Sequence, residues 1–459
     1  MSDEHHSGLL YGLEQRIPPL PAFFSALQHV LAGLVGIITP PLIIGATLGL
    51  GDWLPYLISM SLLASGIGTF LQSNRVWGIG AGMICMQGTS FAFLGVTVAG
   101  GMWVKAQGGG PQDMMAMLFG VNFVAALVPV IVSRFIEPLK KIFTPIITGS
   151  VIALIGISLI KVSVINWCGG EKAEDFASMS NIALGAGTLG VIVLLSCAKN
   201  RWLRLSSVVV GIAVGCIAAG LSGQFHLHSL GDTLFRLPTL FPFGFQFNSA
   251  IFLPVALVSL VCILEAVGDL TANSLISQQS VDDRAFRNRL KGGILADGVS
   301  CMVAAMLSAF PNTTFAQNNG VIQMTGVASR YVGRYIGVIL ILLGLFPPVG
   351  ELLRQIPAPV LGGATMVMFG CVVAAGIRII TQTPLSRRDV LIVGLAFGAG
   401  LGVESVPAFL SHFPPMVGDL FGSAATSGGL VAIALNLILP QEQAATKTIR
   451  SQDDRAESV

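Results

Sequence analysis

The chain has 459 residues, of which 53% are hydrophobic and 10% are charged, and its formal net charge is +2. Its mean hydropathy of +0.79 lies far from that of soluble domains, and so balanced a charge excludes the strongly basic footprint of nucleic-acid-binding proteins. The composition therefore predicts an all-α protein that spans a lipid bilayer many times.

The N-terminal segment MSDEHHSGLL is polar and lacks the basic region and cleavage site of a secretory signal peptide, so we expect no cleaved leader. Six of the seven cysteines fall inside apolar runs, and only Cys168 lies in a predicted loop. That distribution indicates core packing and no disulfide framework. The histidines at 5, 6, 226 and 228 lie in terminal or loop segments, and we expect neither a metal site nor an organic cofactor.

Fourteen apolar segments follow, and most reach the roughly 17–25 residues that a helix needs to cross a bilayer. The first seven lie at 25–48, 54–73, 79–98, 113–133, 142–162, 181–198 and 205–222. The second seven lie at 249–276, 291–309, 312–329, 335–354, 357–380, 389–410 and 418–439. We therefore expect two repeats, 25–222 and 249–440, joined by a linker at 223–248 and flanked by tails at 1–24 and 441–459.

Spans three and ten are the least apolar, and both carry uncharged polar segments. QGTSFAFLG begins at Gln87, and TTFAQNNGVIQMTG runs from Thr313 to Gly326, so that TSFA and TTFA lie 224 positions apart. Lipid cannot solvate such groups, and paired polar breaks in two halves are typical of a transporter's binding site. We expect two discontinuous helices around a cavity, with Gly320 and Gly326 at positions where the backbone bends or is closely approached.

A second match supports the repeat. Three positions of span five recur 214 positions later in span twelve: Pro145, Gly149 and Gly156 as Pro359, Gly363 and Gly370. Each repeat has seven spans, an odd number, so the two repeats would cross the membrane in opposite directions and form an inverted repeat.

The basic residues predict the orientation. With a cytoplasmic N-terminus, 16 basic residues fall in inner loops and five in outer loops, namely Lys105, Lys161, Lys172, Arg236 and Arg354. Cytoplasmic loops are enriched in Lys and Arg, so both termini are expected in the cytoplasm.

Of the ionisable residues in the predicted spans, we single out Glu265 and Asp269 in span eight, Asp297 in span nine, and His29 near the start of span one. Glu265 and Asp269 lie four positions apart and share one helix face. A charge at mid-bilayer costs about 2.5–3.5 kcal/mol on insertion scales, so such residues are functional candidates. Desolvation favours the neutral acid, which suits a proton carrier. Each could instead be structural; Asp269 could hold a broken span in shape, and His29 could be a core histidine.

The segment Gln317 to Gly326 resembles the signature of the nucleobase–ascorbate transporter family, also called the nucleobase–cation symporter-2 family. That signature reads Gln, Glu or Pro, then Asn, any residue, Gly, four residues, Thr, and Arg, Lys or Gly. The pair Gln28-His29, the acids at 265, 269 and 297, and the segments GVASRYVG and PAPVLGGATMVMFG are also similar to the family. The resemblance covers about 20–440, and the bacterial xanthine permeases are the branch it indicates.

This resemblance implies a core domain of spans 1–4 and 8–11 and a gate domain of spans 5–7 and 12–14. It implies two short antiparallel strands in spans three and ten, with substrate between them. It also implies a homodimer through the gate domain and a bacterial inner-membrane location.

By the same resemblance, Glu265 and Gln317 would be the main substrate ligands. Asn318 would support the site, and Asp297 and His29 would tune coupling and geometry. From the residues themselves, Ser90 and Thr314 would lie on the facing breaks, and Phe91 or Phe315 could stack on a ring or could face the core or the lipid.

The implied activity is import of a purine nucleobase, xanthine first, by proton symport with alternating access. The alternative is a dual xanthine and uric acid carrier or a uric acid permease, because Ser90 is smaller than the Asn of some xanthine-selective relatives. A uracil permease is a more remote alternative. Either Asp297 or Glu265 could carry the proton. We expect no enzymatic activity, because Asp269 lacks the Gly-x-Gly-Asp element of intramembrane aspartyl proteases.

Overall fold

A computed structural model of the protein describes residues 9–135, 144–170, 173–200, 203–204, 206–223, 234–281, 283–381, 384–413, 421–422 and 424–440. Outside the described residues lie the start of the N-terminal tail, the whole C-terminal tail and part of the linker, with His5, His6, His226 and His228 and the basic residues Lys140, Lys141, Lys172 and Arg201.

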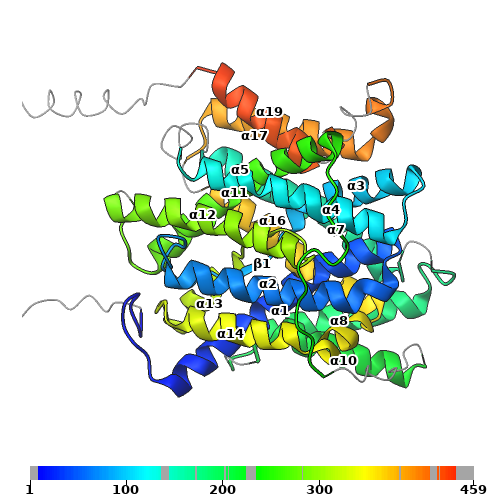
Figure 1. Ribbon diagram of the computed structural model, residues 1–459, viewed down its shortest axis with the longest axis horizontal. Helices are drawn as coiled ribbons and strands as arrows, with labels where there is room; N and C mark the ends of the chain where they lie inside the picture. The colour runs from blue at the N-terminus through cyan, green and yellow to red at the C-terminus, as the bar shows by residue number, and fades with distance from the viewer. Residues whose placement is uncertain are drawn as a thin grey trace, which may run out of the picture.

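Helices make up nearly all of the described chain (Figure 1). The first half contains α1 (Pro19–Leu48), η1 (Gly51–Trp53), α2 (Leu54–Asn74), β1 (Gln87–Thr89), η2 (Phe91–Phe93), α3 (Leu94–Ala106), α4 (Pro111–Ala125), α5 (Leu127–Val132), α7 (Pro145–Trp167), α8 (Met179–Ser196) and α10 (Ser207–Leu221). The second half contains α11 (Ser249–Ile276), α12 (Arg284–Met306), β2 (Asn312–Thr314), α13 (Gln317–Thr325), α14 (Val332–Leu345), α15 (Pro347–Arg354), α16 (Ala358–Ile380), α17 (Arg387–Ser405), η3 (Pro407–Leu410) and α19 (Ala424–Ile438).

Within the described ranges, seven helices are long and apolar enough to cross a membrane, and an eighth span results if the bent pair α14 and α15 is counted as one. The two members of that pair meet at 78°. The seven helices correspond to expected spans one, two, four, five, six, eight and twelve. The prediction of a helical membrane protein is therefore confirmed.

The two short strands expected in spans three and ten are present and pair with each other. They are antiparallel, with Gln87 opposite Thr314, Gly88 opposite Thr313 and Thr89 opposite Asn312. The backbone ladder continues past both ends, because Ser90 N–H donates to Pro311 O over 2.8 Å and Phe315 N–H donates to Met86 O over 3.0 Å. Neither break therefore leaves these backbone groups unpaired in a lipid-excluded interior.

The register of the strand pair can be compared with the match between TSFA and TTFA. The pair is centred on Gly88 and Thr313, so its local two-fold relates Thr89 to Thr314, one position away from that match. Ser90 faces Pro311, while Thr314 faces Gln87.

Gly88 has a packing reason to be glycine. A Cβ at this position would overlap the ring of Phe315, and a Cβ at Gly36 of α1 would also crowd that ring. Phe315 is 6% exposed, so it anchors the strand pair against α1.

The two glycines singled out in the polar segment behave differently. Gly326 ends α13 with φ of 67°, a left-handed conformation that favours glycine, and its carbonyl accepts from Leu10 N–H and Tyr11 N–H. Gly320 lies inside α13, and a Cβ there would meet no atom within 4 Å. The expectation of a bend or close approach is confirmed for Gly326 and wrong for Gly320.

The helices pack in two groups. In one, α7 packs against α16, and α8, α10, α17 and α19 join them. In the other, α2 packs against α14, and α1, α3, α4, α5, α11, α12, α13 and α15 complete the group. The strand β1 lies near the centre of the molecule (Figure 1).

Small residues allow α7 and α16 to approach closely. A Cβ at Gly156 of α7 would lie 2.8 Å from Val373 N and 3.1 Å from Phe369 O of α16. Gly370, which the predicted repeat matches with Gly156, would meet nothing within 4 Å. Packing therefore requires glycine at only one of these two positions.

We expect Gly156→Ala to destabilise the protein by about 1–3 kcal/mol, because the added methyl group overlaps a backbone that cannot rotate away. Gly370→Ala makes the same chemical change in open space and should be neutral or slightly stabilising. The melting temperatures of the two detergent-solubilised variants measure the difference. Equal shifts would contradict the packing role of Gly156.

Candidate functional site

A cavity of about 190 Å³ lies where the two helix groups meet the strand pair. The second group contributes most of the polar wall, and α7 and α16 contribute apolar residues such as Ile152, Ile155 and Val372. Seven of the ten residues singled out from the sequence line it: Ser90, Phe91, Glu265, Asp269, Thr314, Phe315 and Gln317.

The two acids of α11 differ in their surroundings. Asp269 is 7% exposed; its Oδ2 accepts a hydrogen bond from Thr314 Oγ1 over 3.1 Å, and its backbone carbonyl accepts from Asn319 Nδ2 over 3.4 Å. It therefore ties α11 to β2 and α13. Glu265, one turn earlier, is partly exposed, and no described residue donates a hydrogen bond to its carboxylate. Its oxygens remain available to accept from a ligand.

Gln317 is the first residue of α13, directly after the second break, and its side chain is half-buried at the cavity. An amide side chain offers both a donor and an acceptor. Its neighbour Asn318 lies behind the cavity, where its Nδ2 donates to Ile84 O over 2.6 Å. Asn273 Nδ2 of α11 donates to the same carbonyl over 2.6 Å. These two amides hold α11 and α13 against the segment that precedes β1.

His29 lies beside Asn318 and is 1% exposed. Neither ring nitrogen of His29, nor Asn318 Oδ1, finds a hydrogen-bond partner in good geometry among the described residues. The structure therefore places His29 behind the cavity, against the residue that follows Gln317.

Asp297 of α12 is 6% exposed and also lies outside this cavity. Its Oδ1 accepts from Gln72 Nε2 over 2.9 Å and from Gln87 Nε2 over 2.7 Å. Gln72 of α2 also donates to Gly293 O over 2.9 Å and accepts from Ala81 N over 3.0 Å. Gln72 and Gln87 were not predicted as partners of Asp297, although a glutamine near the end of an apolar span, as Gln72 is, was an available signal.

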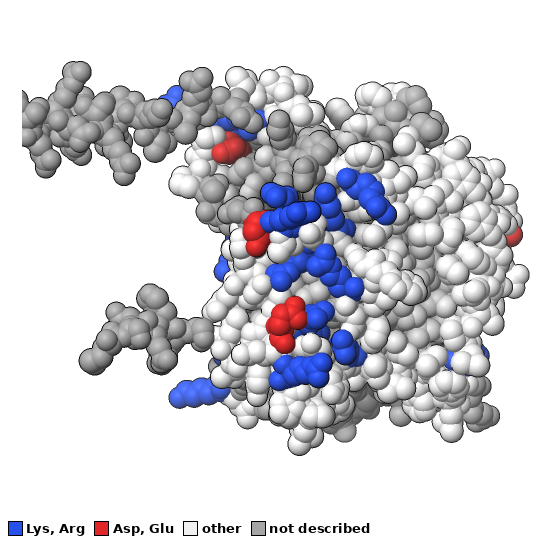
Figure 2. Space-filling model, turned by 60° about the vertical axis from the view of Figure 1, so that its left-hand side comes forward, with Lys and Arg blue, Asp and Glu red and all other residues white. Residues whose placement is uncertain are grey.

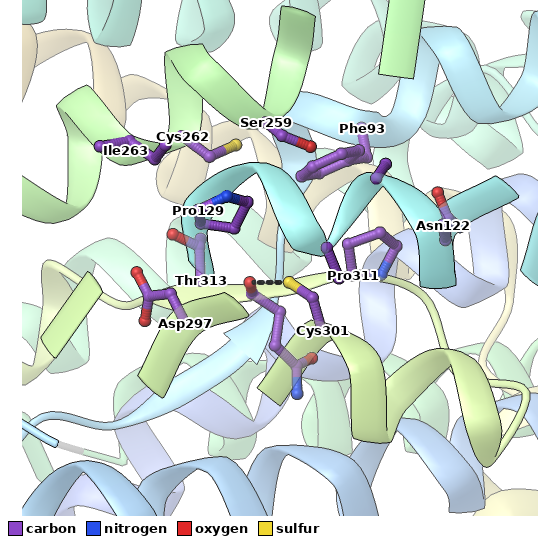
Figure 3. A pocket seen from close by; sticks show the side chains of 13 residues that line it. Phe93, Asn122, Pro129, Ser259, Cys262, Ile263, Asp297, Cys301, Pro311 and Thr313 are labelled. Atoms are coloured by element: carbon purple, nitrogen blue, oxygen red, sulfur yellow. Dashed lines mark hydrogen bonds between the residues drawn. The ribbon is translucent and has the colours of Figure 1, made fainter. Parts of the chain in front are cut away.

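Asp297 also lines a second cavity of about 20 Å³ on the α12 side of the strand pair (Figure 3). In it, Cys301 Sγ donates to Asn312 O over 3.0 Å, while Asn122 Nδ2 and Thr313 Oγ1 have no described partner. The volume suits about one water molecule, which could bond to these polar groups. Thr313 lines both cavities and therefore separates them.

The aromatic candidates are held differently. Phe91 is half-buried, and its ring meets Phe369 of α16 edge-on, with centroids 5.0 Å apart and planes at 85°. Phe315 is fixed among the glycines that surround its ring. Both phenylalanines line the cavity. Stacking of either ring on a ligand stays a prediction.

None of the three acids belongs to an ion pair among the described residues, whose pairs are Arg330–Glu14, Arg354–Glu351 and Arg388–Asp389. Among the described residues, no basic side chain therefore neutralises any of these three acids. The described residues also contain no group of three His, Cys, Asp or Glu that could hold a metal.

Comparison with protein families matches residues 21–409 to the Permease family. Xanthine permease XanP of Escherichia coli (strain K12) is 41% identical over 451 residues, which cover 96% of this chain and 97% of that protein. Xanthine permease XanQ of the same strain is 43% identical over 448 residues, with 96% of each chain covered. Uric acid permease PucJ of Bacillus subtilis (strain 168) is 33% identical over 424 residues, covering 90% of this chain and 92% of the relative.

Solved structures share the fold. The transmembrane domain of the cyanobacterial bicarbonate transporter BicA has a TM-score of 0.60 at 15% identity, over 93% of this chain and 99% of that one. Murine Slc26a9, an anion transporter in an inward-facing state, has a TM-score of 0.60 at 10% identity, over 92% of this chain and 69% of that one. Identities this low concern the fold alone.

Replacing Gln72 by Leu should destabilise the protein by about 1–3 kcal/mol, because Asp297 Oδ1, Gly293 O and Ala81 N all lose a buried partner. Gln112→Leu, at an exposed position in the first turn of α4, makes the same change in solvent and should be nearly neutral. Melting temperatures in detergent distinguish the two variants, and an unshifted Gln72→Leu protein would show that these hydrogen bonds do not stabilise the fold.

Proposed function

The chain belongs to the Permease family of nucleobase–ascorbate transporters, and on this premise we propose that it imports xanthine across a bacterial inner membrane. The observation that carries the proposal is the cavity that brings Glu265 and Gln317 together between the two helix groups. The two relatives named as xanthine permeases support the choice of substrate.

The chemistry of the cavity suits a purine dione. Xanthine presents ring N–H donors and C=O acceptors alternately around its edge. Glu265 would accept from ring N–H groups, and the amide of Gln317 would donate and accept. Phe91 would pack on the ring face, because its half-buried ring borders the cavity, whereas Phe315 would serve as a fixed wall.

Uric acid is the second candidate substrate, and uracil a remote third. Ser90 lines the cavity, with its Oγ 3.6 Å from Cys262 Sγ, and its small side chain leaves room for the additional C8 oxygen of urate. A relative named as a uric acid permease is 33% identical. These observations support a carrier of both purines as the alternative to a xanthine permease.

We propose that the fourteen segments form a seven-plus-seven inverted repeat. The group around α2 and α14 would be the core domain, and the group around α7 and α16 the gate domain. A cavity lined by both groups suits alternating access, since relative motion of the two groups would open it to one side or the other. A homodimer would form through the gate, and both termini would lie in the cytoplasm.

The coupling ion in this proposal is a proton. Glu265, Asp269 and Asp297 lie close together without a basic partner in the described ion pairs, so uptake of one proton would relieve their mutual repulsion. Asp297 is the preferred carrier because it lies outside the substrate cavity, where a bound purine does not contact it.

In cells that lack their own purine carriers, we expect uptake of labelled xanthine and competition by urate, with little uptake of hypoxanthine or uracil. A protonophore should abolish accumulation, because the proton gradient would no longer drive it. Uptake of uracil alone would overturn the purine assignment, and sodium-dependent uptake that survives the protonophore would overturn proton coupling.

Glu265→Gln should reduce xanthine uptake by on the order of 10- to 100-fold, because a charged acceptor for ring N–H groups becomes a neutral amide. Glu174→Gln is the matched control at an exposed loop position and should transport normally. Both proteins are first quantified in the membrane fraction. Normal transport by the Glu265 variant would contradict its role as a ligand.

A further inference from the structure

A groove of about 630 Å³ lies apart from the transport cavity, where the segment before α1 crosses the start of α14. One end of this groove carries the guanidinium groups of Arg16 and Arg334. The remainder is apolar, with Phe23 of α1 and Val338 and Leu342 of α14 in its wall.

The charged end is organised around Tyr331. The guanidinium carbons of Arg16, Arg330 and Arg334 lie 5.7, 5.4 and 5.0 Å from the centre of its ring. A hydrogen bond with Arg16, helped by the positive charge of Arg330, lowers the pKa of the Tyr331 hydroxyl. Three like charges converge here on one aromatic side chain.

Acidic residues neutralise only part of this charge. Glu14 pairs with Arg330 over 2.9 Å, and Arg334 donates from Nε to the neutral side chain of Asn74. Arg16 and Arg334 belong to no ion pair among the described residues. Arg289 lies within electrostatic range of Arg330, of Arg75 and of the acid Asp283. Among the described residues, the end of the groove therefore keeps a positive excess.

The apolar end is open to the surroundings. Phe23 is 42% exposed, Val338 47% and Leu342 59%, and the latter two lie one turn apart on the same face of α14. In a membrane protein, such a face contacts acyl chains. Figure 2 shows that Lys and Arg side chains gather on one face of the molecule, with a broad uncharged surface beside them.

We propose that this groove binds an anionic phospholipid, with its phosphate between Arg16 and Arg334 and an acyl chain against Phe23, Val338 and Leu342. A ligand must be anionic to match the arginines and amphiphilic to match the wall, and a membrane supplies one molecule with both properties. Guanidinium groups bind phosphate oxygens through paired N–H donors, and basic side chains near a membrane surface favour anionic lipids.

The lipid would also hold the N-terminal segment against the residues that follow α13. Ala328 N donates to Tyr11 O over 2.9 Å and Arg330 N to Leu13 O over 3.0 Å, directly after α13 ends. A phosphate that binds both Arg16 and Arg334 would add a further link between the N-terminal segment and α14. Bound lipid should therefore raise the melting temperature of the whole protein.

The test uses the purified full chain in detergent, titrated with phosphatidylglycerol or phosphatidylcholine and observed by native mass spectrometry and thermal melting. We expect saturable binding of phosphatidylglycerol with a rise in melting temperature, and no such response to phosphatidylcholine. The double variant Arg16→Gln/Arg334→Gln should bind phosphatidylglycerol on the order of 30-fold more weakly. Arg387→Gln removes an exposed charge at the start of α17 and should bind normally.

Arg16→Glu provides a second variant at an exposed side chain, where folding is not at stake, and it should weaken binding further. Equal binding of the two lipids, unchanged binding by both Arg16 variants, or an equal loss in Arg387→Gln would overturn the proposal. Displacement of phosphatidylglycerol by the same concentration of inorganic phosphate would also overturn it, because the site would then recognise a free anion.

Discussion

Lipid cannot hydrogen-bond the backbone of a broken helix, so each break in this protein has to be satisfied by protein groups. The strands Gln87–Thr89 and Asn312–Thr314 meet that constraint by pairing with each other. Because the partners come from different halves of the chain, the pairing brings both halves to the same point. It also fixes the cavity there, since Ser90 directly follows β1 and Gln317 lies three residues after the end of β2. The candidate site therefore lies where the backbone groups of the two breaks form hydrogen bonds with each other.

A layer of buried amides supports this arrangement. Ile84 O, just before β1, receives hydrogen bonds from Asn273 and Asn318, and Ala81 N donates to Gln72. The irregular segment between α2 and β1 is thereby held by α2, α11 and α13 at once. Side chains that touch no substrate in the proposed mode would still set the position of those that do.

The polar segments in spans three and ten were visible in the sequence because they contradict an apolar background, and the acids of span eight were visible for the same reason. Their exact pairing was not, because a one-position shift between TSFA and TTFA leaves the composition unchanged and only the strand register decides it. Gly320 was misjudged since glycine in a helix can be required or merely tolerated, and only the neighbouring atoms distinguish the two. Gln72 was missed because its partner Asp297 is 225 residues away in the chain.

The hydrogen bonds of Asp297 give the proposed proton coupling a physical route. Its Oδ1 accepts from Gln87 Nε2, and Gln87 stands opposite Thr314, whose hydroxyl donates to Asp269 in the candidate substrate cavity. Hydrogen bonds to a carboxylate are stronger than those to a neutral acid. If Asp297 takes the coupling proton, its hold on Gln72 and Gln87 weakens, and β1 is freed on the side away from the substrate. The strand pair would then sense the proton on one face and the purine on the other, without the two ligands touching.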